Sequence, residues 1–196
     1  MQPLPDSAGA VLDFWFGAPH DPVHGQQRAL WFQKRKATDE AIRTAFLADI
    51  ERALAGDLTH WTAVPRGALA HILLLDQFTR NVFRDTPRAF AGDTQALEIA
   101  QQCVDAGTHL ALLPVERVFV YLPFEHAEDA HAQRVAVRLF EALAQAHPGF
   151  EDTLDYARRH QAVIARFGRF PHRNAILGRT STAAEIAYLA EPGSGF

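Results

Sequence analysis

Carboxylate, arginine and histidine side chains gather in three short stretches of an otherwise largely apolar chain of 196 residues. The first stretch, residues 76–81, reads DQFTRN; the second, residues 166–174, reads RFGRFPHRN; and the third, residues 123–129, reads PFEHAED. Arginine binds carboxylate and phosphate groups through paired hydrogen bonds, and histidine exchanges protons near neutral pH. The three stretches therefore predict a site for a small anionic molecule, with proton transfer as its chemistry.

The first stretch places Asp76, Arg80 and Arg84 on one stripe of a helix, because they are spaced four residues apart. Gln77 and Asn81 form the neighbouring stripe. Asp76 follows a strongly apolar segment, so its carboxylate is expected to point inward and to pair with Arg80. Two interpretations stay open: an internal ion pair that fixes helix packing, or the wall of a site that aims arginines at a ligand.

The second stretch is a loop whose path Gly168 and Pro171 constrain. A constrained loop is a common place for an anion site, so we expect its arginines to point outward to a ligand. The alternative is a surface loop whose arginines cap the ends of helices.

The third stretch follows Pro123, which is expected to interrupt one helix and to open the next. Glu125, Glu128 and Asp129 would then be stabilised by the helix dipole alone. The functional alternative makes His126 a general base that Glu125 or Glu128 orients.

The candidate site residues follow from these stretches and from the helix that precedes the loop. The predicted catalytic groups are Glu125, His126 and His172. The predicted ligand-binding residues are Asp76, Gln77, Arg80, Asn81, Arg84, Glu128, His160, Arg166, Arg169, Arg173 and Asn174. Three histidines could converge with Asp76 on a divalent metal, but their spacing matches no metal signature, so no metal is predicted and any cofactor is unknown.

The elements that must position these residues are all helical. Apolar residues recur at helical spacing, and no segment alternates as a strand does, which predicts an all-α fold of about eight helices. Thr38 and Asp93 are expected to cap helices, and residues 26–34 are expected to form another. No linker divides the chain, so residues 1–196 are expected to form one domain, with residues 1–9 loosely ordered.

Composition narrows the function classes. The formal net charge of −4 gives no basic field for a polyanion, which argues against a nucleic-acid partner. Cys103 is the only cysteine, and neither a secretory signal nor a membrane span is apparent. These features predict a cytoplasmic protein. A small anionic ligand or a peptide is the expected partner, and the oligomeric state is left open.

Four segments together resemble a known family. In chain order they read VLDFWFG at 11–17, LLLDQFTRNVFR at 73–84, YLPFEHAE at 121–128 and GRFPHRNAILGR at 168–179, and they resemble the bacterial family of unknown function DUF924. The resemblance implies an all-α fold similar to the tetratricopeptide-repeat superfamily, without clear repeats. The family pattern has serine where this chain has Ala127, so a role that needs a hydroxyl group there has no support.

Three hypotheses stay open on these grounds. The polar stretches could line one small-molecule site, which would be enzymatic or not. The chain could be a tetratricopeptide-type module that binds a peptide in a groove. Alternatively, the polar stretches could be purely structural and join helices through internal ion pairs.

Overall fold

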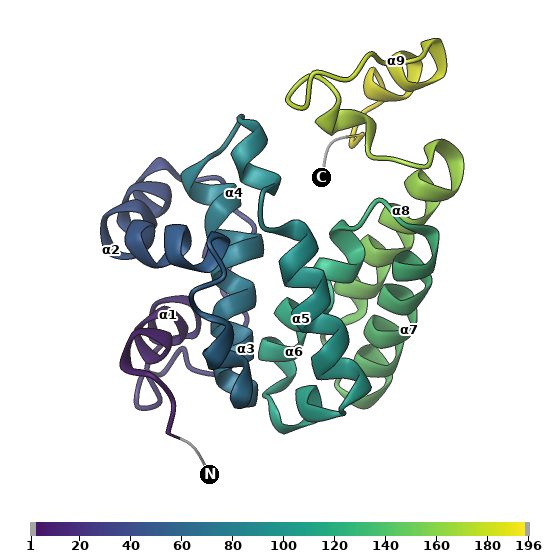
Figure 1. Cartoon of the computed structure of the whole chain (residues 1–196). Helices are drawn as coiled ribbons and strands as arrows, with labels where there is room; N and C mark the ends of the chain where they lie inside the picture. Colours follow the sequence, from purple (N-terminus) through teal and green to yellow (C-terminus); the bar gives the residue numbers. More distant parts are fainter. Residues whose placement is uncertain (1–2, 195–196) are drawn as a thin grey trace. The chain divides into compact units, whose positions relative to one another are not determined.

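The computed structural model describes residues 3–194, which fall into two compact units. Unit 1 comprises Met1–Arg84 and Arg88–Pro123, and unit 2 comprises Asp85–Pro87 and Phe124–Phe196. The regular structure of residues 3–194 is entirely helical, which confirms the all-α prediction (Figure 1). The helices are α1 (Asp6–Phe16), α2 (Lys36–Leu54), α3 (Pro65–Ile72), α4 (Thr79–Val82), α5 (Asp93–Asp105), α6 (Pro114–His126), α7 (Ala130–Ala146), α8 (Glu151–Phe167) and α9 (Ala183–Leu189).

One continuous helix forms the centre of unit 1. It consists of α3, a π-helical turn at Leu73–Phe78 (η3) and α4, and Pro65 begins it as the sequence predicts. The helices α1, α2 and α5 pack against it. Counted as one helix, α3, η3 and α4 bring the described chain to the predicted number of about eight helices.

Aromatic side chains fill the core of unit 1. The Trp15 ring lies 5.3 Å from the Phe78 ring and 5.7 Å from the Phe119 ring, both in edge-on contacts. The predicted helix at residues 26–34 is wrong, because only Ala29–Trp31 form a single 3-10 turn. Trp31 and Arg28 instead donate hydrogen bonds to the Trp15 carbonyl. This carbonyl lies in the last turn of α1, where carbonyl groups have no N–H partner within the helix.

Two predicted helix caps, Thr38 and Asp93, are wrong. Thr38 lies inside α2, which begins at Lys36, and Asp93 is the first residue of α5 rather than its cap. The carboxylate of Asp93 is bound to Arg80 instead of to its own backbone. A strong tertiary ion pair thus takes precedence over a local cap.

The helix α6 corrects the expectation for Pro123. The helix continues through this proline and ends one turn later, at His126. Glu125 and His126 therefore belong to the C-terminal end of α6 and not to the start of the next helix. The next helix, α7, is capped by Asp129, whose carboxylate accepts a 2.7 Å hydrogen bond from the Ala132 N–H.

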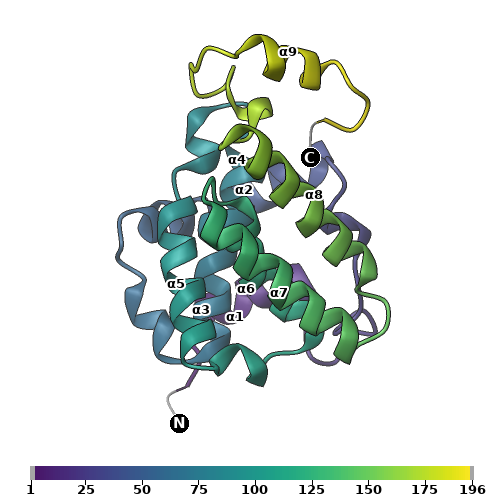
Figure 2. The ribbon, with the colours of Figure 1, turned by 90° about the vertical axis from the view of Figure 1, so that its right-hand side faces the viewer.

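Unit 2 is built on the antiparallel pair α7 and α8, which run side by side in both ribbon views (Figures 1 and 2). Gly168 ends α8 in the left-handed conformation, with φ 69°. The loop that follows is packed onto α8 by a small core of Val163, Ile164 and Phe170. A capping box begins α9, because Thr182 and Glu185 bind each other's backbone.

The chain start differs from the expectation. Asp6–Gly9 belong to α1 and Ala8 is fully buried, so the loosely ordered stretch cannot extend beyond Pro5, and residues 1–2 lie outside the described part. A single domain over residues 1–196 stays a prediction. None of the helices in residues 3–194 is both long and apolar enough to span a membrane.

Candidate functional site

The first polar stretch lies in the π-helical turn of unit 1. Asp76 is fully buried, and its carboxylate lies 3.2 Å from the Arg80 guanidinium, as the sequence predicts. Arg80 also binds Asp93 through two hydrogen bonds of 2.9 and 3.0 Å. Burial alone would lower the pKa of Arg80, but the two carboxylates outweigh it and raise that pKa. Arg80 is therefore a permanent cation that holds η3 and α5 together.

The other polar residues of this stretch turn toward α2. Arg84 binds the Asp39 carboxylate with contacts of 2.8 to 3.1 Å, and Asn81 donates to the same carboxylate at 2.7 Å. Gln77 donates to Asp76 at 2.5 Å. In unit 1 these residues therefore join helices through internal ion pairs.

The third stretch contributes Glu125 to a contact with α8 inside unit 2. Its carboxylate lies 3.2 Å from Nδ1 of His160, and both side chains are buried. Gln133 on α7 donates to the backbone carbonyls of Glu125 and Ala127, at 2.6 and 2.9 Å, which fixes the end of α6. The carboxylate that the sequence assigned to orienting His126 thus contacts a different histidine.

His160 is held as a neutral imidazole. Burial first, and then the nearby His126, His172 and Arg173, lower the pKa of His160 to about 3, against the raising effect of a hydrogen bond to the Tyr156 carbonyl. The Nδ1 atom lies 2.9 Å from that carbonyl oxygen. Since both neighbours of Nδ1 are acceptors, Nδ1 carries the proton and Nε2 carries the lone pair.

Three further groups gather around the buried ring of Phe170. The His160 ring lies 5.4 Å from it, the His172 ring 5.7 Å, and the Arg173 guanidinium 4.6 Å above its face. The His126 ring lies 6.3 Å from that of His160. We call this group the histidine cluster; its members are Glu125, His126, His160, His172 and Arg173.

A second network holds the loop that carries the histidine cluster. Glu128 accepts two hydrogen bonds from Arg179, at 2.6 and 2.9 Å, and a third from the Phe170 N–H at 2.7 Å. Burial alone would raise the pKa of Glu128, but these bonds outweigh it and lower that pKa. Asn174, also buried, accepts from Arg179 and donates to Ser181. This network gives Glu128 and Asn174 a positioning role.

The expectation that the loop arginines point freely outward is wrong. Arg169 makes a two-pronged ion pair with Glu185, and this pairing first, with the Thr182 N–H second, lowers the pKa of Glu185 to about 2. Arg173 is 6% exposed and stacks on Phe170. Arg166 stacks on Phe167 and Tyr188. Arg169 and Arg173 are therefore held by partners within unit 2, whereas Arg166 is exposed and stacked on aromatic rings.

The structure therefore brings together some of the predicted site residues and assigns the others elsewhere. The second and third stretches meet in unit 2, whereas the first belongs to unit 1, and a single pocket shared by all three stays a prediction. The sequence does not reveal the contacts of Asp39, Asp93 and Gln133, because the partner of each lies elsewhere in the chain.

Among residues 3–194, no group of three His, Cys, Asp or Glu side chains is arranged to hold a metal ion.

Comparison with known proteins identifies the family. The model of the family described as bacterial protein of unknown function, DUF924, matches residues 11–193. The chain belongs to this family. It is similar to a solved protein of unknown function from Agrobacterium tumefaciens, with 38% sequence identity and a TM-score of 0.80 over 93% of this chain and 96% of that one. No curated protein matches the chain.

Proposed function

We propose that the histidine cluster binds a small anionic molecule that carries a carboxylate or phosphate group. The observation that carries the proposal is the grouping of two imidazoles and a guanidinium around the buried ring of Phe170, with a third imidazole, that of His126, beside His160. The guanidinium of Arg173, stacked on Phe170 within the cluster, supplies positive charge that would attract an anion. The aromatic ring and the Glu128–Arg179 network keep these groups in place before a ligand arrives.

The proposal includes proton transfer by His126 or His172. These side chains are half-buried; the His126 ring contacts that of His160, and the His172 ring contacts that of Phe170. Glu125 would act through His160, whose Nδ1 its carboxylate contacts.

Phosphate binding tests this proposal. Inorganic phosphate should raise the melting temperature of the wild-type chain in a saturable way. It should also shift the NMR ring signals of His126 and His172 while those of the exposed His20 stay in place. We expect Arg173→Gln to abolish the stabilisation and Arg158→Gln, which removes an exposed guanidinium on α8, to preserve it.

A folded Arg173→Gln chain that is still stabilised by phosphate would overturn the proposal. If that variant fails to fold, His172→Gln takes its place, because His172 is only half-buried. Phosphate shifts at His20 equal to those at His126 and His172 would also contradict it.

The arrangement and location of the chain are proposed on separate grounds. We propose a tetratricopeptide-like arrangement because α7 and α8 form an antiparallel pair with a short connection, the unit from which such proteins are stacked. We propose a cytoplasmic location because the only cysteine, Cys103, is buried as a free thiol. The formal net charge of −4 supports a partner other than nucleic acid.

A further inference from the structure

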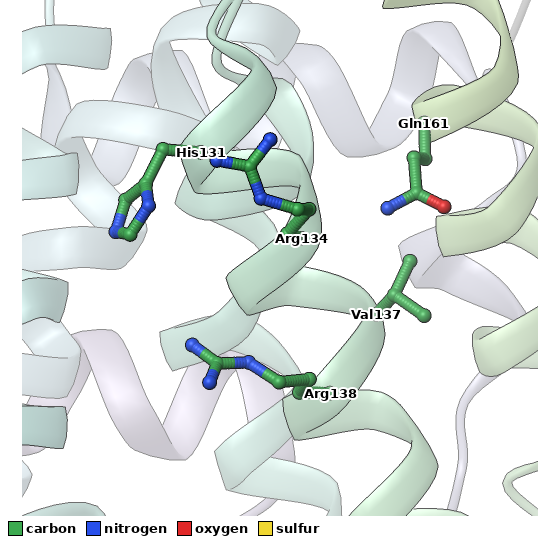
Figure 3. A pocket seen from close by; sticks show the side chains of 5 residues that line it. All are labelled: His131, Arg134, Val137, Arg138 and Gln161. Atoms are coloured by element: carbon green, nitrogen blue, oxygen red, sulfur yellow. The ribbon is translucent and has the colours of Figure 1, made fainter. Parts of the chain in front are cut away.

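Unit 2 carries a shallow groove along α7, and none of its lining residues belongs to the histidine cluster. It is lined by His131, Arg134, Val137, Arg138 and Gln161 and has a volume of about 390 Å³. In Figure 3 the three basic side chains leave α7 on one side, while Val137 and Gln161 lie toward the space between α7 and α8. We call it the α7 groove.

The two arginines of the α7 groove differ from most other arginines of the chain. On α8, Arg158 is paired with Glu141 and Arg159 with Asp155. Within residues 3–194, neither Arg134 nor Arg138 has a carboxylate within ion-pair distance, although both are exposed. The chain as a whole is negative, so this local excess of positive charge is not a general property of its surface.

We propose that the α7 groove binds an extended acidic peptide segment of a protein partner. Four residues of helix separate the two arginines by about 6 Å along the axis. Alternate residues of an extended chain are about 6.6 Å apart and point to the same side. Two carboxylates at alternate positions therefore match Arg134 and Arg138. Val137 offers apolar contact, and the Gln161 amide can bind a peptide group.

The lining residues favour a peptide over a nucleic acid. Single-stranded nucleic acids bind through aromatic side chains on which successive bases stack, and His131 is the one aromatic side chain among the five lining residues, with no Phe, Tyr or Trp beside it. The net charge of −4 would also repel a long polyanion, whereas a short acidic segment brings few charges. This inference is independent of the proposed function of the histidine cluster.

A fluorescent octapeptide of alternating glutamate and threonine tests the inference. Its glutamates share one face when the peptide is extended, and a peptide with the same composition in two blocks lacks that spacing. We expect the alternating peptide to bind the full chain at low salt, more tightly than the block peptide, and to be released in about 0.5 M salt. The double variant Arg134→Gln/Arg138→Gln should weaken binding about tenfold.

The matched control is Arg158→Gln/Arg159→Gln, which removes the same charge from exposed positions on α8. It should leave peptide affinity within about twofold of wild type. Both double variants should retain the wild-type circular dichroism spectrum, because glutamine is a good helix former. The inference would be overturned by equal losses in the two double variants, by absence of peptide binding, or by tighter binding of a single-stranded oligonucleotide of equal charge.

Discussion

Glu125 and Glu128 are three residues apart, yet their carboxylates meet partners of different charge. Glu125 contacts the neutral His160, whereas Glu128 is bound by the permanently charged Arg179 and by a backbone N–H. A carboxylate beside a neutral imidazole can accept a proton or orient the ring, while one held by a guanidinium is fixed in its ionised form. The two residues are therefore expected to fail in different ways when they are substituted.

Glu128→Gln should lower the free energy of unfolding by about 2 kcal/mol, because it weakens a two-pronged ion pair that is mostly buried. Glu141→Gln is the matched control, since Glu141 makes a single, exposed contact with Arg158. That control should cost less than about 0.5 kcal/mol. Urea unfolding measures both, and equal costs would show that the Glu128 network is not a structural anchor.

His160 should make stability depend on pH. Its pKa is about 3 in the folded chain, because of burial and nearby cations, and about 6.5 in an unfolded chain. The unfolded state therefore binds the extra proton, so the contribution of His160 is complete above pH 6.5 and is lost as pH falls toward 3. We expect the free energy of unfolding to fall between pH 6.5 and pH 5.

His160→Asn should reduce this fall, because asparagine keeps a donor for the Tyr156 carbonyl but does not titrate. Proton uptake on unfolding, measured from the slope of stability against pH, should decrease by about one proton. A residual slope is expected from His71, whose pKa burial lowers to about 4. Identical slopes for the variant and wild type would contradict a buried neutral His160.

At the scale of elements, the start of α5 and the π-helical turn approach each other unusually closely. A Cβ atom on Gly92 would lie 2.4 Å from the Leu75 carbonyl oxygen. Because of this close approach, Asp93, the residue after Gly92, binds Arg80. The glycine is needed for space rather than for its backbone angles, because its φ of −93° suits any residue.

Gly92→Ala should therefore lower the free energy of unfolding by about 3 kcal/mol, since two backbone segments would have to move apart. Gly9→Ala, in α1, is the control, because its added Cβ would meet nothing closer than 3.9 Å. That change should be neutral or stabilising, as alanine favours helix. Thermal unfolding measures both, and a stable Gly92→Ala chain would contradict the close approach.

Helix ends were predictable where local chemistry decides them. Gly168 and the Thr182 capping box behave as the sequence indicates, since each needs only neighbouring residues. Asp93 and Thr38 did not cap their helices. A sequence shows the donors and acceptors near a helix end, but it does not show that Arg80 competes for Asp93 from another helix.

In the candidate site, too, contacts within one helix were predictable, whereas contacts between helices were not. The inward Asp76–Arg80 pair was predictable because both residues lie on one helix. The Glu125–His160 contact was not, because it joins α6 to α8 across 35 residues of chain. For the same reason, the sequence could not show that Arg169 and Arg173 are packed rather than free.

At the scale of the whole molecule, unfolding can be followed separately in the two units. The three tryptophans, Trp15, Trp31 and Trp61, all belong to unit 1. Fluorescence therefore reports on unit 1 alone, whereas far-ultraviolet circular dichroism reports on helices of both units. If residues 1–196 are one domain, the two signals should change at the same urea concentration.

A variant that removes a stabilising ion pair from unit 2 makes this test more specific. In a single domain, Glu128→Gln should shift the tryptophan transition as far as the circular dichroism transition, although Glu128 lies in unit 2. A tryptophan transition that stays in place while the circular dichroism signal becomes biphasic would show two domains.

The helix α6 has a consequence for how this family could change over evolutionary time. Its residues up to Pro123 belong to unit 1, and its last turn supplies Glu125 to unit 2. A recombination event at the boundary between the units would thus cut α6 and separate Glu125 from the preceding turns of its own helix. We expect the two units to be inherited as one piece, and the family model indeed spans both.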